Sequence, residues 1–271
     1  MRVEYNESGR AQAPKRNKKK KGFGVHFFCF FLMISVSVLI ALSLTVWFNV
    51  SGFRLSGSSV YSEAEVLSAT GILNGDNLWR IDTDAAEESI EQLLPYVGTA
   101  KIGRKLPGTV TVKLTPAEEY AFVNTESGAA IIDSEFKVLK NISENENRLF
   151  VIKGMSFKEA VPGQKLTFSD SEQQKTLSEI TDLLNEYGFS SDGQYGITMI
   201  DMADTLNVKM ILDDRLYVVI GSMSNIENKL VHLKSMIGQV NMNATARIDL
   251  SDWSKDNKKA ALVYEDISVY K

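Results

Sequence analysis

The stretch VGTAKIGRKLPGTVTVKL, residues 97–114, decides the fold of the first half of the chain. From Val110 to Leu114 apolar and polar residues alternate, which is typical of a β-strand with one buried face. In the middle stands LPGT, residues 106–109, where proline fixes φ and glycine supplies a positive φ. The stretch therefore predicts two antiparallel strands joined by a tight turn.

Two helices and a further strand are predicted ahead of this pair. Ser62 and Glu65 have the spacing of a capping box, in which each side chain accepts a hydrogen bond from a backbone N–H of the first helical turn. The pair Asp82-Thr83 supplies the cap of a second helix, which carries an apolar stripe. An apolar run at the start of the same region predicts a strand. The order of elements over residues 48–117 is therefore β-α-α-β-β.

Charge is distributed unevenly along the chain, whose formal net charge is -4. Residues 1–24 hold eight Lys or Arg and two Glu, a balance of +6, which leaves -10 for the rest. VHFFCFFLMISVSVLIALSLTVW, residues 25–47, follows the lysine run without a charged residue. As a helix it is roughly 34 Å long, enough to cross a hydrocarbon core of ~30 Å. We predict a membrane helix over 25–47 with Trp47 at the far interface and a cytoplasmic lysine run of Lys18, Lys19, Lys20 and Lys21.

Other interpretations of this segment stay open. The lysine run could be a nucleic-acid patch or a localisation signal, and the apolar run could belong to a cleaved signal peptide. The apolar cores of signal peptides are roughly 7–15 residues long, so the length of this run favours a retained anchor. We therefore expect residues 1–24 to form a cytoplasmic tail and the rest of the chain beyond residue 47 to be extracytoplasmic.

Residues 118–252 predict a second domain of mixed α/β type with a largely antiparallel sheet. Short apolar runs separated by turn residues predict the strands, and helical spacing of apolar residues predicts a helix from Asp170 to Tyr187. Ser224 and Glu227 repeat the capping-box spacing and predict the start of another helix. The tail over residues 253–271 is left open as an added strand or a flexible end.

Motifs of enzymatic chemistry are almost absent. Ser134 and Lys137 fit the S-x-x-K pattern of penicillin-binding enzymes, but strand-like residues flank them and predict a turn where that motif needs a helix. Asp213-Asp214 is better explained as a turn than as a catalytic pair, because neighbours on a strand point to opposite faces. One cysteine and two histidines argue against a zinc site. We expect no enzyme, no cofactor and no metal.

Five motifs in a fixed order resemble the FtsQ/DivIB family of bacterial cell-division proteins, in which a POTRA domain follows a single membrane anchor. They are FNV at 48–50, GSSVYS at 57–62, GILNGDNLWRID at 71–82, LPYVGTA at 94–100 and RKLPGTVTV at 104–112. The resemblance continues through the second domain to IDLS at 248–251. One departure is Phe136, which stands where the family has a glycine.

This resemblance implies a divisome scaffold without enzymatic activity, at the septum of the plasma membrane. Its partners would be FtsB/DivIC-like and FtsL-like single-pass proteins, and through them the septal peptidoglycan synthase. The C-terminal end of the second domain would bind these partners, and Trp253 and Tyr264 are the expected anchors because large aromatic residues dominate interfaces. The full set of expected contacts is Ile248, Leu250, Trp253, Leu262 and Tyr264. The alternative for Ile248 and Leu250, and also for Trp253 and Tyr264, is a place in the core. Arg104 and Lys105 are a second candidate contact, for a partner or for anionic headgroups.

Two other functions remain compatible with the residues. A POTRA component of a secretion or sporulation complex would share the first domain but not the partners. A membrane-anchored cell-wall enzyme would use Ser134 as its nucleophile. The second domain favours division over the secretion or sporulation role.

Overall fold

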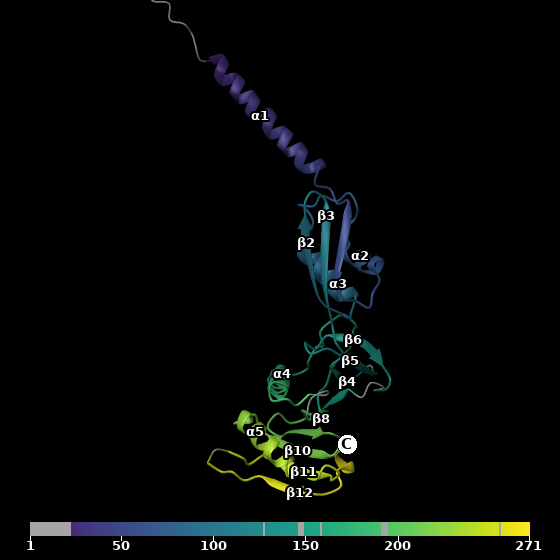
Figure 1. The fold of residues 1–271 in the computed structure, drawn as a ribbon, viewed down its shortest axis with the longest axis vertical. Coiled ribbons are helices and arrows are strands. Elements are labelled where there is room, and N and C mark those ends of the chain that lie inside the picture. Colours follow the sequence, from purple (N-terminus) through teal and green to yellow (C-terminus); the bar gives the residue numbers. More distant parts are fainter. Residues whose placement is uncertain (1–22, 127, 146–148, 158, 191–194, 255) are drawn as a thin grey trace, which may run out of the picture.

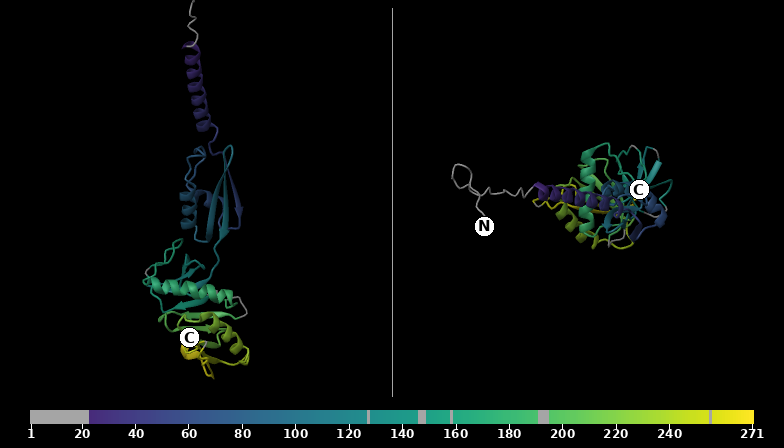
Figure 2. Two further views of the ribbon diagram at one scale, coloured as in Figure 1. Left: turned by 90° about the vertical axis from the view of Figure 1, so that its left-hand side faces the viewer. Right: turned by 90° about the horizontal axis from the view of Figure 1, so that it is seen from above.

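The computed structural model describes residues 23–271 except 127, 146–148, 158, 191–194 and 255, and describes only the backbone of 23, 25 and 41–46. The lysine run lies outside the described residues. Figure 1 shows three parts in a row along the longest axis: a long helix, a small α/β domain and a larger one. The left view of Figure 2 shows the same succession from a second side, and the right view looks along this axis from above.

The long helix is α1 (Phe23–Val46), and its described large apolar side chains between Phe27 and Ile40 are exposed. Among the residues that the structure describes, no helix is both long and apolar enough to cross a membrane. The membrane helix over 25–47 therefore stays a prediction.

The first domain is a three-stranded sheet with two helices. Along the chain its elements are β1 (Gly52–Gly57), α2 (Glu63–Thr70), α3 (Thr83–Leu93), β2 (Val97–Lys105) and β3 (Thr109–Pro116). The strands lie in the order β1-β3-β2, with β3 parallel to β1 and antiparallel to β2. This confirms the predicted β-α-α-β-β order.

The predicted helix caps of the first domain are also confirmed. Ser62 donates its N–H to Glu65 Oε2 at 2.8 Å, and Glu65 donates its N–H to Ser62 Oγ at 3.3 Å. Asp82 Oδ1 accepts from the N–H of Ala85 at 3.1 Å. These caps set the helices so that their apolar stripes pack on the sheet, in a core that includes Val66, Leu78, Ile90, Val97, Ala100, Val110, Val112 and Leu114.

The second domain is built on one nine-stranded sheet of described strands. They are β4 (Ala121–Thr125), β5 (Gly128–Ile132), β6 (Val138–Ile142), β7 (Phe150–Lys153), β8 (Ile197–Asp201), β9 (Val208–Leu212), β10 (Leu216–Gly221), β11 (Ala246–Asp249) and β12 (Ala261–Tyr264). Their order is β12-β11-β10-β9-β8-β7-β4-β5-β6. The pairs β4–β7, β7–β8 and β10–β11 are parallel and the rest antiparallel. Helices α4 (Ser171–Glu186) and α5 (Ile226–Ile237) contribute their buried faces to the main core.

The start of α5 differs from the prediction. Its N-cap residue is Asn225, which has a φ of 57° and makes no side-chain cap bond. The capping box of Ser224 and Glu227 is therefore wrong, because the helix begins one residue later than that spacing requires. Asparagine adopts this left-handed conformation more readily than most residues.

The turn after β5 also departs from the family pattern. Phe136 takes a φ of 65°, in the region that glycine favours. Its ring packs edge-on against Phe168 with a centroid distance of 5.3 Å. Asp133 Oδ1 accepts from the N–H groups of Glu135 at 2.9 Å and Lys137 at 2.8 Å. Packing and these two bonds hold the turn without a glycine.

The tail over residues 253–271 belongs to the second domain. It supplies β12 and a short 3₁₀ turn, η1 (Ser268–Tyr270). The Tyr270 ring stacks on Tyr217 at 3.9 Å, and Ile267 is buried beside them. Because residues alternate between the faces of a strand, this small cluster covers the sheet face opposite the main core.

Candidate partner-binding edge

Strand β12 forms an open edge of the nine-stranded sheet. Among the described strands it pairs with β11 alone, with Leu262 opposite Ile248 and Tyr264 opposite Ala246. In the part of the chain that the structure describes, no strand lies on its other side. An edge strand presents a row of backbone N–H and C=O groups that can pair with an incoming strand.

The side chains of β12 make this edge apolar as well as open. Val263 is 49% exposed and Tyr264 is 57% exposed. Leu262 is half-buried and packs on the main core, which holds the strand in place. Lys258 and Lys259, just before β12, are exposed. A partner strand would therefore meet an apolar edge with positive charge at its start.

Ile248 and Leu250 lie in the main core, where both are fully buried. Their side chains cannot touch a partner in this structure, because β12 and the core enclose them. They support the edge from within, which corrects the expectation that they contact a partner directly.

Trp253 is also buried, at 9% exposure, although it was expected to be an anchor for a partner. Its ring stacks on His232 of α5 at 5.7 Å. The indole Nε1 has no hydrogen-bond partner among the described residues. Trp253 thus fixes the loop that leads from β11 to β12, and of the two expected anchors only Tyr264 is well exposed.

An ion pair on β11 stiffens the strand that carries the edge. Arg247 Nη2 lies 2.9 Å from Asp249 Oδ2, and Ser251 donates through its N–H and Oγ to Asp249 Oδ1. Burial alone raises the pKa of the Asp249 carboxyl, but the hydrogen bonds from Ser251 and the ion pair with Arg247 outweigh it and hold the pKa below its usual range.

The opposite edge of the same sheet is partly covered. Val138 of β6 donates its N–H to Gln164 O at 2.9 Å and accepts from the N–H of Gly163 at 2.8 Å. The segment around these two residues therefore occupies the first part of the β6 edge. This leaves β12 as the more accessible of the two ends.

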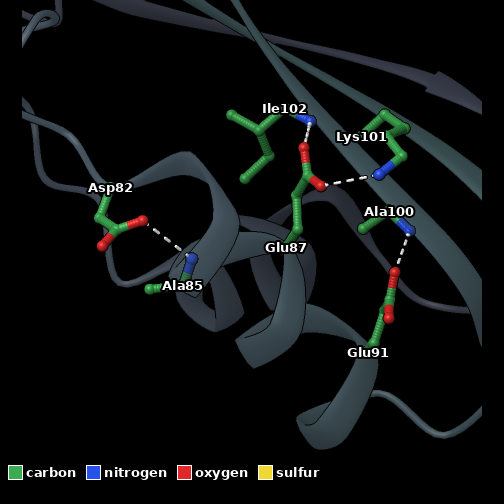
Figure 3. A network of polar contacts seen from close by, with 7 residues as sticks. All are labelled: Asp82, Ala85, Glu87, Glu91, Ala100, Lys101 and Ile102. Atoms are coloured by element: carbon green, nitrogen blue, oxygen red, sulfur yellow. Dashed lines mark hydrogen bonds and ion pairs between the residues drawn. The ribbon is translucent and has the colours of Figure 1, made fainter.

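In the first domain, α3 closes the β2 edge (Figure 3). Glu87 Oε1 accepts from the N–H of Ile102 at 2.7 Å, and Glu91 Oε1 accepts from the N–H of Ala100 at 2.8 Å. Glu87 Oε2 also lies 3.0 Å from Lys101 Nζ. Two outward N–H groups of β2 are thus satisfied by carboxylates, and they are not available to a partner strand.

Arg104 has an internal role at the end of this same strand. Its Nε donates to Leu78 O at 2.8 Å and its Nη2 donates to Ile81 O at 2.6 Å. The side chain therefore holds the loop before α3. Lys105 is exposed.

The residues with candidate catalytic motifs lie in turns between strands. No group of three His, Cys, Asp or Glu side chains among them could hold a metal ion. Ser134 and Lys137 lie in the turn between β5 and β6, and Lys137 is buried with its Nζ donating to Val97 O. Asp213 and Asp214 both have positive φ and form the turn between β9 and β10, as predicted.

The FtsQ-type POTRA domain family matches residues 48–115, the β-α-α-β-β unit described above. The chain is thus similar to the FtsQ/DivIB family through its POTRA domain and through relatives that carry these names. It is 36% identical over 107 residues to cell division protein FtsQ of Corynebacterium glutamicum, a match that covers 38% of this chain and 48% of that one. With FtsQ of Streptomyces venezuelae it shares 29% identity over 135 residues, 47% of this chain and 48% of the other.

A longer and weaker match reaches into the second domain. Cell division protein DivIB of Clostridium tetani is 20% identical over 202 residues, 74% of each chain. The matches to the two FtsQ relatives span about half of those proteins' length. The family model covers the POTRA domain and ends well before β12.

Sequence reasoning missed the closed edge of the POTRA sheet. Glu87 and Glu91 are four residues apart and so share one face of α3. This spacing can be seen in the sequence and places both carboxylates on the same side of the helix. That they bond the N–H groups of β2 follows only from the packing of α3 beside this strand.

Proposed function

We propose that this chain is a non-enzymatic, single-pass membrane scaffold of the bacterial divisome. In this proposal α1 anchors it in the plasma membrane at the septum, with the lysine run in the cytoplasm and both domains outside. The β12 edge then binds FtsB/DivIC-like and FtsL-like proteins, and this complex regulates septal peptidoglycan synthesis. Relatives named as cell-division proteins support the process, and the apolar sequence of α1 supports the anchor.

The observation that carries the partner proposal is the contrast between edges. The β2 edge has its N–H groups capped by Glu87 and Glu91, and the β6 edge is partly covered. At β12, by contrast, exposed Val263 and Tyr264 accompany a strand with one neighbour. Backbone pairing at such an edge provides affinity, and the exposed side chains provide selectivity.

Capture from source-cell membranes tests this function. The full chain would be used as bait, and the bound proteins would be identified by mass spectrometry. We expect short coiled-coil membrane proteins together with a septal transpeptidase. Recovery of secretion or sporulation components in their place would overturn the divisome assignment.

Two variants then test the edge itself. Val263→Glu and Tyr264→Glu should each weaken capture at least tenfold, because an interface anchor contributes about 2 kcal/mol or more. Val60→Glu, which changes an exposed valine of the POTRA domain, is the matched control and should capture normally. Normal capture by all three folded variants would remove the β12 edge from the proposal.

A further inference from the structure

The end of the POTRA domain that adjoins α1 is formed by two loop tips. Residues 48–51, which follow α1, form backbone hydrogen bonds with both loop tips. Val50 N–H donates to Asp76 O at 2.8 Å, and Ser51 N–H donates to Gly108 O at 2.8 Å. Leu78 N–H donates to Phe48 O at 2.7 Å. The loop over 73–79 and the turn over 105–108 therefore lie beside the end of α1, and Figure 1 shows this end of β2 and β3 facing that helix.

Large apolar side chains are exposed at this end. They are Trp47 at 74%, Leu73 at 68%, Trp79 at 56% and Leu106 at 54%, and we call these four residues the collar. Trp79 is braced by Phe48, whose ring lies edge-on at 6.2 Å. Exposed apolar residues gathered in one place mark an interaction surface more often than single ones do.

The charges beside the collar are mainly positive. Arg80 and Lys105 are exposed, and neither makes an ion pair within the described residues. The acid of the same loop, Asp76, turns its Oδ2 to the N–H of Leu73 at 2.8 Å. A negatively charged surface would therefore meet the side chains of Arg80 and Lys105, while the Asp76 carboxylate is engaged in a hydrogen bond within its own loop.

We propose that the collar rests in the headgroup layer of an anionic bilayer and so fixes the POTRA domain against the membrane. Tryptophan, leucine and basic residues together suit this layer. The indole rings and leucine side chains reach the apolar part of the lipid, while the arginine and lysine side chains contact the phosphate groups. Continuity selects the lipid over a protein partner: Trp47 directly follows the last residue of α1. The inference rests on the proposed function in one respect, namely that α1 is a membrane anchor.

Tryptophan quenching in liposomes tests the collar. The full chain has three tryptophans, Trp47, Trp79 and Trp253, so phenylalanine at the other two positions leaves one reporter at a time. The liposomes would contain phosphatidylglycerol and lipids brominated either near the headgroup or near the chain ends. We expect Trp79 to be quenched by the shallow bromines and Trp253, in the distant second domain, to stay unquenched.

The outcomes separate the collar from the anchor. Quenching of Trp47 without quenching of Trp79 would overturn the collar and leave the anchor standing. If neither is quenched and the chain does not float with the liposomes, the anchor fails and the collar fails with it.

A second variant avoids the loss of the buried Trp253. Cys29→Ser removes the single cysteine, and Leu106→Cys then carries an environment-sensitive fluorophore at an exposed site. Val60→Cys is the matched control, because it is exposed beyond the far end of β1. A blue shift at position 106 and none at position 60 supports the collar, and equal spectra at both positions contradict it. Arg80→Glu and Lys105→Glu should reduce the shift at position 106.

Discussion

Lys137 of the second domain donates a hydrogen bond from Nζ to the backbone oxygen of Val97, the first residue of β2 in the POTRA domain, at 2.6 Å. The lysine is buried. Burial lowers the pKa of its ammonium, and the nearby Asp133 carboxylate partly opposes this. The S-x-x-K pattern thus ends in a structural lysine that joins the two domains.

A second contact reinforces the same joint. Tyr96 OH donates to Glu119 Oε1 at 2.7 Å, and Lys140 Nζ lies 2.9 Å from that oxygen. Gly163 comes so close to α3 that an added Cβ would lie 1.8 Å from Gln92 O. The POTRA domain and the second domain are therefore held in a defined orientation, which sets the direction of β12 relative to the POTRA domain.

We predict that Lys137→Met loosens the joint without unfolding either domain. The change leaves Val97 O without its donor, a cost of about 1–3 kcal/mol, but it also removes a buried charge. Spin labels at Val60 and Met242, both exposed, would report the interdomain distance in the Cys29→Ser background. The distance distribution should broaden, whereas Lys165→Met, at an exposed ion pair, should leave it unchanged. A narrow distribution for Lys137→Met would contradict this role.

Gly163→Ala should shift the same distance. A Cβ at this position meets the backbone of Gln92, and the φ of 88° adds strain. The matched control is Gly188→Ala, at a φ of 74° with open space around it, which should cost about 1–2 kcal/mol of stability and leave the distance alone. Identical distances in both variants would show that the close approach at Gly163 does not set the domain orientation.

Glu87→Gln should destabilise the POTRA domain in a pH-dependent way. Burial alone raises the pKa of the Glu87 carboxyl, but the N–H of Ile102 and the Lys101 ammonium outweigh it and lower the pKa. A lowered carboxyl pKa stabilises the fold at pH values above the ordinary glutamate pKa of about 4.3. This stabilisation is lost as the pH falls through the pKa of the folded state.

The difference in unfolding free energy between wild type and Glu87→Gln should therefore be about 1–2 kcal/mol at neutral pH and shrink toward pH 3. Denaturant melts at several pH values measure it. Glu159→Gln, at an exposed residue, is the control and should show no comparable trend. A difference that is constant from neutral to acid pH would mean that the ionised carboxylate is not what caps β2.

The POTRA domain could be predicted from the sequence because its signals are local. Ser62 and Glu65, Asp82 and the turn around Pro107 each act on residues close by in the chain. The turn lies where it was predicted, but its Gly108 does not take the positive φ that was expected. The capping box at Ser224 failed because the helix entry depends on the backbone of Asn225, which no spacing rule fixes. Phe136 similarly replaces a glycine because packing against Phe168 stabilises an unfavourable φ.

The candidate site was predicted less completely, because edge and core residues look alike in a single sequence. Ile248 and Trp253 are apolar and near the C-terminal end, as an interface residue would be, but the order of strands puts both inside. Only the sheet order shows that β12 is an open edge of the second domain's sheet and that Tyr264 lies on it. The bond from Lys137 to Val97 spans 40 positions along the chain and has no local signature.

Amide hydrogen exchange of the full chain, free and in the presence of the FtsB/DivIC-like protein that we propose as its partner, tests the central claim most directly. If the partner adds a strand to the sheet, amides of residues 261–264 should gain strong protection while those of β2 do not change. Binding that leaves β12 unprotected and protects the POTRA sheet would contradict the account.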